Sequence, residues 1–364
     1  MLHRSKSLLA VAAAAGTVCA LAAAGAALAT SATPHWTGSK SAVPNVFTNA
    51  TPGMSAFYET NQGVAGTFLV WKGQLDNKVQ YKYKINGKWS KGIGTIPGAF
   101  TTTSPSAAFY TDPDSKAAEL VFWKRLHSNK IFYSQGEVAS NGTISWTSPL
   151  QLPGGSLATT SSAPAVFFPL NSVHGRVIVA WRGPFNHVRY ELGTPSGRGF
   201  NWTGTSYWIG KGTSADPTTT ISAPALTEIL SNDGNTGVIY VFWRDHDHKS
   251  ISYASVPNNN PGGLPGGKSL PWTLLGQVAG ADSTVGPAVS SVNAHNDGPL
   301  LLAYKGPGGE YIRYQTLTGG TWSAVAYVTG AHNTTTLGPA LINGALASVS
   351  PTNSGRVYLH FYTP

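Results

Sequence analysis

The sequence predicts an all-β protein: a six-bladed β-propeller closed by strands from both ends of the chain and preceded by a cleaved signal peptide. Three observations predict it: an apolar N-terminal leader, a strand motif that recurs six times, and an incomplete unit at each end of the remaining chain. The motif is an apolar run that ends in an aromatic residue, usually followed by a basic one. These aromatic anchors lie 52 to 62 residues apart, which suits a four-stranded blade. The anchors are Trp71, Trp123, Trp181, Trp243, Tyr304 and Phe361.

The leader has the three parts of a secretory signal. Arg4 and Lys6 precede an apolar run from Leu8 to Ala24, and small residues follow over 27–32. We therefore expect residues 1–32 to be removed and the mature chain, residues 33–364, to be secreted without stable membrane insertion. The single cysteine, Cys19, lies in the leader, so the mature protein is expected to contain no disulfide.

Each repeat divides into four expected strands. In the second repeat they cover residues 106–113, 118–124, 130–137 and 142–152, with Asp, Asn, Gly, Pro and Ser in the turns between them. The third strands share a tyrosine, the fourth strands share a tryptophan, and a proline marks each junction. The tyrosines are Tyr81, Tyr133, Tyr190, Tyr253 and Tyr314, the tryptophans Trp89, Trp146, Trp202, Trp272 and Trp322, and the prolines Pro105, Pro164, Pro224, Pro287 and Pro339. The strands are apolar on both faces, so the anchor tryptophans are expected to pack between blades.

The two ends of the mature chain are expected to build the sixth blade together. Trp36 lies in a fourth-strand sequence that has no first three strands before it, and the chain stops after an expected second strand at Phe361. Such an arrangement would remove the open edge of the ring. No third strand with a recurring tyrosine is found for this blade, which leaves it either three-stranded or completed irregularly.

Two sets of loops are expected on one face of the propeller because antiparallel strands alternate in direction. The loops between second and third strands carry basic residues, and the loops that lead to the next repeat are rich in Thr and Ser. Cationic donors beside hydroxyls suit the hydroxyl, carboxylate or sulfate groups of glycans. Alternatively, the basic residues bond to turn carbonyls and the threonines close local turns. The expected ligand-binding residues are Lys72, Lys124, Arg125, Arg182, His187, Arg244, His246 and Lys305.

Charge favours an acidic partner for this face. The formal net charge of the whole chain is +9, and it is +7 without Arg4 and Lys6. A basic surface suits an anionic glycan or a cell-wall polymer, although exported proteins are also basic without a specific partner. We expect a monomer that binds no nucleic acid and uses no cofactor.

No metal site and no catalytic residue are assigned from the sequence. The HExxH, paired CxxC and EF-hand patterns are absent. Adjacent Asp and His residues over 245–248 could ligate a divalent metal, but the sequence fixes no supporting ligands elsewhere, which favours a solvated charged turn. A glycosidase needs two carboxylates that face each other across the substrate. The scattered candidates are Glu119, Glu191, Glu228 and Glu310.

The repeat unit resembles the blades of the fucose-binding-lectin-like propellers of bacterial and fungal proteins. The shared features are S-x-P-A, an apolar strand ending in FW-K/R, then I-x-Y, W-S/T and a Gly/Thr-rich return, and they extend from Trp36 to Phe361. The resemblance implies sugar sites between adjacent blades, typically with an arginine, a carboxylate and aromatic residues. Arg182 and Arg244 would supply the arginine, whereas no acidic residue recurs at a fixed offset. Sialidase-like propellers are the enzymatic relatives, but their S-x-D-x-G-x-T-W repeat is absent.

The sequence therefore predicts a secreted, non-catalytic, lectin-like propeller that binds carbohydrate through its basic, Thr-rich loop face. Two alternatives stay open: a sialidase-like glycoside hydrolase on the same fold, and a scaffold that binds protein at the cell surface.

Overall fold

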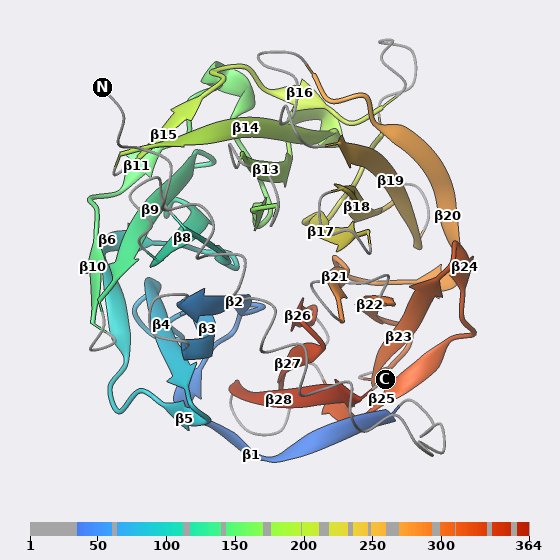
Figure 1. Ribbon diagram of the computed structural model, residues 1–364, viewed down its shortest axis with the longest axis horizontal. Coiled ribbons are helices and arrows are strands. Elements are labelled where there is room, and N and C mark those ends of the chain that lie inside the picture. The colour runs from blue at the N-terminus through green and yellow to red at the C-terminus, as the bar shows by residue number, and fades with distance from the viewer. Residues whose placement is uncertain are drawn as a thin grey trace, which may run out of the picture. The chain divides into compact units, whose positions relative to one another are not determined.

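The computed structural model describes residues 35–59, 64–111, 117–139, 143–169, 176–197, 199–210, 218–231, 236–246, 249–259, 269–292, 299–309, 311–332, 337–350 and 355–363. The expected leader, residues 1–32, lies outside these ranges. Trp36 to Thr363 form one compact unit of six antiparallel sheets (Figure 1). None of the helices in the described ranges is long and apolar enough to span a membrane.

The six sheets are the blades of a propeller, numbered here from the sheet that contains β2. The first strand of each blade lies on the inside of the ring and contacts the first strands of both neighbouring blades. The first strands are β2 (Gly53–Glu59), β7 (Ser106–Thr111), β12 (Ala165–Phe167), β17 (Ala225–Leu230), β21 (Ala288–Ser291) and β26 (Ala340–Ile342).

The second and third strands form the body of each blade. The second strands are β3 (Val64–Lys72), β8 (Ala117–Lys124), β13 (Val177–Arg182), β18 (Thr236–Arg244), β22 (Leu300–Lys305) and β27 (Ala345–Val349). The third strands are β4 (Lys78–Ile85), β9 (Ile131–Val138), β14 (Val188–Ser196), β19 (Ser250–Asn259), β23 (Tyr311–Thr318) and β28 (Arg356–Thr363).

The outermost strand is divided into two short segments in four of the blades. These segments are β5 (Lys88–Trp89) and β6 (Gly94–Phe100), β10 (Ile144–Trp146) and β11 (Leu150–Gln151), β15 (Gly199–Trp202) and β16 (Tyr207–Trp208), and β24 (Thr321–Trp322) and β25 (Ala326–His332). In blade 4 the outer strand is continuous as β20 (Thr273–Asp282), with two irregularities in its register against β19. In blade 6 it is β1 (His35–Phe47). Short 3₁₀ turns, η1 (Gly155–Leu157) and η2 (Pro184–Asn186), lie in two of the loops.

The recurring aromatic residues pack between blades, as the sequence predicts. The third-strand tyrosine of one blade meets the fourth-strand tryptophan of the next, edge-on. Ring centroids are 5.3 Å apart for Tyr81 and Trp146, and 5.7 Å apart for Tyr253 and Trp322. The anchor tryptophans of blades 1 to 4 are between 0 and 3% exposed. They are therefore core residues and are not part of any exposed binding surface.

Blade 6 corrects one expectation from the sequence. Phe361 lies on the third strand, β28, and not on a second strand, so the blade has all four strands. Its second strand, β27, has Ser348 where the other blades have the aromatic anchor, because Ser348 pairs with Tyr358 just as Trp71 pairs with Gln80.

A two-residue hairpin joins the first and second strands of blade 6. Asn343 and Gly344 both have positive φ, 42° and 72°, and join β26 to β27. Asn-Gly between apolar runs is a strong hairpin signal. The aromatic motif does not identify the second strand of this blade, because that strand has the small residue Ser348 at the anchor position.

The expected closure of the ring by both ends of the chain is confirmed. Strand β1 pairs with β28, blue beside red in Figure 1. Trp36 is 6% exposed and packs 5.3 Å from Tyr362 in its own blade and 5.6 Å from Tyr314 in blade 5. Thr37 Oγ1 donates a hydrogen bond of 3.2 Å to the Phe361 carbonyl. The first residues of the propeller thus join its last strand to the preceding blade.

We predict that Trp36→Ala lowers the free energy of unfolding by about 3–5 kcal/mol, because it removes the aromatic contact that seals blades 5 and 6. Urea unfolding followed by tryptophan fluorescence measures it. Phe47→Ala is the matched control on the same strand, since Phe47 is 37% exposed and meets only the Arg356 guanidinium among aromatic and cationic partners of the described residues. Its cost should be about 1 kcal/mol or less. Equal costs for both variants would contradict the sealing role of Trp36.

Candidate functional site

The loops between second and third strands hydrogen-bond to the connections between blades, so both sets share one face. In five places the backbone N–H of a Thr or Ser that begins a connection donates to the carbonyl of a loop residue. The pairs are Thr48 to Gly355, Thr101 to Asn77, Thr160 to Asn129, Thr220 to Asn186 and Ser283 to Lys249, at 2.7 to 2.9 Å. We call this face the loop face.

The hydroxyls of these same five residues close local turns. Thr101 Oγ1 donates to the Thr103 carbonyl and accepts from the Thr103 N–H, both at 3.1 Å. Thr48, Thr160, Thr220 and Ser283 repeat the pattern. The threonine-rich segments are therefore first of all turn-forming elements that bring the chain from one blade to the next.

Two of the expected arginines are held on these turns. Arg182 donates from Nε at 2.9 Å and from Nη2 at 2.5 Å to Asn186 Oδ1, and from Nη1 at 2.9 Å to the Ile221 carbonyl. Arg244 donates from Nη1 to the Thr284 carbonyl at 3.2 Å. The two guanidinium groups thus bind successive turns and do not meet at one point.

The other expected residues lie around the same face in different environments. Lys72 is 6% exposed and donates to Asn49 Oδ1 at 2.5 Å, and Lys305 is 3% exposed. Lys124 ends β8, and the Arg125 guanidinium lies 4.8 Å from the Phe132 ring centre. His246 is exposed. His187 is the one that joins a larger cluster. Their role in ligand binding stays a prediction.

The blade 3 cluster consists of Phe185, His187, Arg189 and Trp208. Arg189 faces Trp208 across β14 and β16, with its guanidinium carbon 5.8 Å from the ring centre. His187 lies edge-on to Trp208 at 5.5 Å and beside Phe185 at 6.1 Å. Phe185 is 82% exposed at the tip of η2 and has a positive φ of 61°. The cluster therefore offers aromatic surface to solvent beside a cation.

A carboxyl group lies on the same side of the strand as this cluster. His187, Arg189 and Glu191 alternate along the chain, so their side chains project from one face. Each has one buried atom with no hydrogen-bond partner among the described residues: His187 Nδ1, Arg189 Nε and Glu191 Oε2. Buried polar atoms normally have hydrogen-bond partners. Three buried atoms without such partners on one strand face are therefore unusual.

Burial sets the electrostatics of these groups. It raises the pKa of Glu191 from 4.5 to about 7, although the Gly204 N–H donates to Oε1 at 2.9 Å. Burial, and secondarily Arg189, lowers the pKa of His187. Near neutral pH the strand face therefore presents a charged guanidinium, a neutral imidazole and a carboxyl group close to its titration point.

Blade 5 repeats the arginine and aromatic pair. The blade 5 cluster consists of Tyr311, Arg313 and Tyr327. Arg313 faces Tyr327 across β23 and β25, with its guanidinium carbon 5.6 Å from the ring centre. Tyr311 and Tyr327 are 55% and 58% exposed and meet edge-on at 6.3 Å.

One residue at the equivalent position differs in chemistry between the two clusters. Blade 5 has Gln315 where blade 3 has Glu191. Both the oxygen and the nitrogen of the Gln315 amide form hydrogen bonds within the protein. It accepts from the Tyr304 hydroxyl at 3.0 Å and donates to the Ala279 and Ser323 carbonyls at 3.0 and 2.9 Å. The blade 5 cluster therefore has a cation and aromatics but no adjacent carboxyl group.

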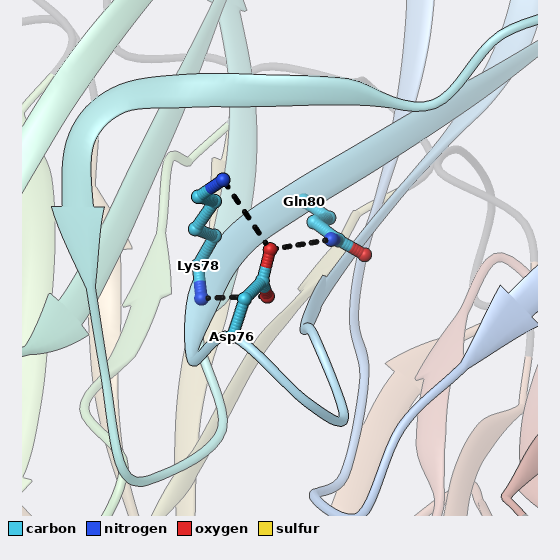
Figure 2. A network of polar contacts seen from close by, with 3 residues as sticks. All are labelled: Asp76, Lys78 and Gln80. Atoms are coloured by element: carbon cyan, nitrogen blue, oxygen red, sulfur yellow. Dashed lines mark hydrogen bonds and ion pairs between the residues drawn. The ribbon is translucent and has the colours of Figure 1, made fainter.

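In blade 1 the equivalent position is filled by a network of polar side chains from the same blade. Gln80 stands where blades 3 and 5 have arginine, and Lys78 stands where blade 3 has His187. Figure 2 shows both bonded to Asp76: Gln80 Nε2 and Lys78 Nζ lie 3.5 Å from Asp76 Oδ2, and the Lys78 N–H donates to Oδ1 at 3.1 Å. The strand partner of Gln80 is Thr95, so no aromatic platform forms.

A glycine makes room for the arginine in each cluster. Gly183 and Gly306 directly follow the basic residue of the second strand, and a Cβ at either position would overlap Arg189 or Arg313. Arg189, Trp208, Arg313 and Tyr327 are absent from the residues expected from the sequence. The sequence does mark the two arginines, because blades 3 and 5 both have Gly-Pro after the basic residue of the second strand and Arg-Tyr near the start of the third strand.

The inner strands enclose a central cavity of about 1280 Å³ that reaches the turns of the loop face. Glu228 is the acidic residue among its described lining residues. Glu119 lies instead between blades 1 and 2, where Ser55 Oγ donates to it at 2.6 Å and burial raises its pKa to about 8. Glu310 lies outside the described residues. Within the described ranges, no group of three His, Cys, Asp or Glu residues is placed to hold a metal ion.

Comparison with known proteins supports the fold. No protein-family model matches the sequence, and no curated protein matches it. Among solved structures, an arginine-to-alanine triple mutant of AofleA from Arthrobotrys oligospora has a TM-score of 0.52 at 11% identity, covering 77% of this chain and 74% of its own. The Aleuria aurantia lectin with Fucα1-6GlcNAc has a TM-score of 0.50 at 12% identity, covering 77% and 79%.

A sialidase is similar to the same degree. The NanB sialidase from Streptococcus pneumoniae has a TM-score of 0.52 at 10% identity, covering 87% of this chain and 68% of its own. The fold implied by the resemblance is therefore confirmed, with a lectin and a sialidase among the neighbours. At these identities the likeness concerns the fold, so the ligand has to be argued from the clusters themselves.

We predict that Glu191 makes stability depend on pH. Because its pKa is raised from 4.5 to about 7 in the folded protein, the unfolded chain releases this proton first. The stabilisation is complete below pH 4.5 and is lost as pH rises through 7. Relative to Glu191→Gln, the wild type should lose free energy of unfolding across this window, measured by urea unfolding at each pH. Parallel pH profiles would contradict the assignment.

We also predict that Gly183→Ala displaces Arg189 from Trp208 and lowers the free energy of unfolding by about 1–3 kcal/mol through overpacking. Gly92→Ala is the control, because a Cβ there meets no atom within 4 Å. It should stay within about 0.5 kcal/mol of the wild type. Chemical denaturation of both variants measures the difference, and a neutral Gly183→Ala would show that the arginine slot is not tightly packed.

Proposed function

We propose that the protein is a secreted, non-catalytic lectin that binds carbohydrate on its loop face through the blade 3 and blade 5 clusters. The observation that carries the proposal is the recurrence, in two blades, of an arginine held against a solvent-accessible aromatic ring beneath a glycine. Recurrence at one structural position indicates a purpose beyond packing, since blade 1 fills the same position with an internal polar network.

The chemistry of both clusters suits a sugar. A pyranose ring presents an apolar face of C–H groups and a rim of hydroxyls. Exposed aromatic side chains such as Phe185, Tyr311 and Tyr327 offer apolar surface for the first, and the arginines offer directed donors for the second. The rings keep little conformational freedom to lose, because Trp208 and Tyr327 are held by cross-strand pairing.

The two clusters would bind different parts of a glycan or different glycans. In the blade 3 cluster Glu191 lies on the same strand face as Arg189 but is 0% exposed, so Arg189, His187 and the aromatic rings are left to contact a sugar. The blade 5 cluster supplies arginine donors and two tyrosines, with Gln315 already engaged. Two sites on one rigid ring allow a branched or polymeric glycan to bind with higher avidity than a monosaccharide.

We predict that the purified chain binds neutral or acidic glycans on an array and that Arg189→Lys and Arg313→Lys each weaken binding by about tenfold. Lysine keeps the charge but loses the planar fork that stacks on the ring. The double variant should lose most of the remaining signal. Gln80→Ala, at the equivalent position of blade 1, is the matched control and should bind like the wild type.

Unfolding curves confirm that each variant is folded before its affinity is interpreted. Absence of binding to every glycan at high protein concentration would overturn the lectin proposal. Binding that survives the double variant unchanged would move the site away from these two clusters.

A further inference from the structure

The mouth of the central cavity contains a second kind of polar site, formed by Arg244 and Thr284. Both residues line the cavity where it meets the loop face. Arg244 ends β18 of blade 4, and Thr284 lies in the turn that leads to blade 5. The guanidinium is fixed there by one hydrogen bond from Nη1 to the Thr284 carbonyl at 3.2 Å.

Both residues keep donor groups that the protein does not use. Arg244 Nε and Thr284 Oγ1 are buried in the cavity wall and have no hydrogen-bond partner among the described residues. Buried polar atoms without a partner destabilise a folded protein and are uncommon. The two residues are in contact through Arg244 Nη1 and the Thr284 carbonyl and both line the cavity, so one acceptor from outside the chain could satisfy both atoms.

Arg182 shows that the unused donor is not a general property of this position. It occupies the same place at the end of the second strand of blade 3 and binds the turn carbonyl of Ile221 in the same way. There, however, Asn186 Oδ1 caps both Nε and Nη2. The two arginines therefore differ in whether the chain supplies an acceptor for Nε.

The charge around Arg244 favours an anion over a neutral acceptor. Arg244 forms no ion pair within the described part of the chain. The same holds there for Lys72, Lys124 and Arg182, which end the second strands of three other blades. Asp245, its neighbour, accepts from Trp243 Nε1 and from the Ser250 and Ser252 hydroxyls. Burial lowers the pKa of Arg244, as expected for a cation without a counter-ion.

The acidic residue of the cavity lies too far away to neutralise this charge. Glu228 is five residues along β17 from the level of Arg244, by the register of β17 and β18. At the usual rise per residue this is roughly 16 Å. That exceeds the screening length of about 8 Å at physiological ionic strength. Glu228 Oε1 also accepts from Asn258 Nδ2 at 2.6 Å.

We propose that the mouth of the central cavity binds an oxyanion, a carboxylate or sulfate group, between Arg244 and Thr284. Arg244 Nε and the Thr284 hydroxyl donate to the anion, and the unpaired guanidinium supplies the countercharge. Cations that end the second strands of neighbouring blades attract the anion to the mouth. This site is separate from the blade 3 and blade 5 clusters and does not depend on them.

The test uses the full chain labelled with ¹⁵N-arginine, titrated with sodium sulfate or sodium glucuronate at constant ionic strength. The Nε–H resonance that disappears in Arg244→Lys identifies Arg244. We expect it to shift saturably with both anions and not with chloride or glucose. Thr284→Val, which keeps the shape of the side chain and removes the hydroxyl, should weaken binding by about tenfold.

Arg182→Lys is the matched control, because Asn186 already satisfies the donors of Arg182, and it should leave the affinity unchanged. Calorimetric titration of Arg244→Lys with sulfate should show at least a tenfold loss. A resonance that does not move, or an equal response to chloride, would overturn the proposal. Retained affinity in both Arg244→Lys and Thr284→Val would do the same. A chain that binds no glycan on the array could still pass this test, so the two proposals fail separately.

Discussion

The pairing of β1 with β28 is the constraint on which the rest of the structure depends. A ring of separate sheets stays closed only if its last blade is held to its first. Strand β1 belongs to blade 6 and is followed directly in the chain by β2 of blade 1, so it ties the two blades together. Trp36 on β1 packs against Tyr362 within blade 6 and against Tyr314 in blade 5. The six inner strands can then enclose a cavity, and the loops of one face are held at fixed angles around it.

Each repeat uses some positions for packing between blades and other positions for the polar groups of the loop face. Aromatic anchors and strand tyrosines fill the seams, and Thr or Ser hydroxyls close the turns. The residues that differ from blade to blade sit at the beginning of the third strand and directly after the second strand. A glycine there admits an arginine in blades 3 and 5, whereas blade 1 uses the same space for Asp76 and Gln80.

Because Glu191 and Gln315 are both buried, the difference between them gives blades 3 and 5 different electrostatic environments. The carboxyl group of Glu191 shares its strand face with Arg189, and its raised pKa follows from desolvation in the seam. In blade 5 the equivalent residue is Gln315, and its amide forms hydrogen bonds within the protein. Arg182 and Arg244 end the second strands of blades 3 and 4, but only the guanidinium of Arg182 has a neighbouring side-chain amide, Asn186, as an acceptor. One scaffold thus carries sites of different polarity.

The sequence by itself determined the six-fold repeat, the four-stranded blade, the closure by both termini and the burial of the anchor tryptophans, because these depend on local patterns and on spacing. It did not reveal the third strand of blade 6, since Ser348 and Leu359 replace the aromatic signal there. Only the tertiary structure decided which polar residues meet. Arg189 and Trp208, or Arg244 and Thr284, are distant along the chain, and their contact depends on strand register and on the angle between neighbouring blades. No local pattern encodes either quantity, so these side-chain contacts could not be predicted from the sequence.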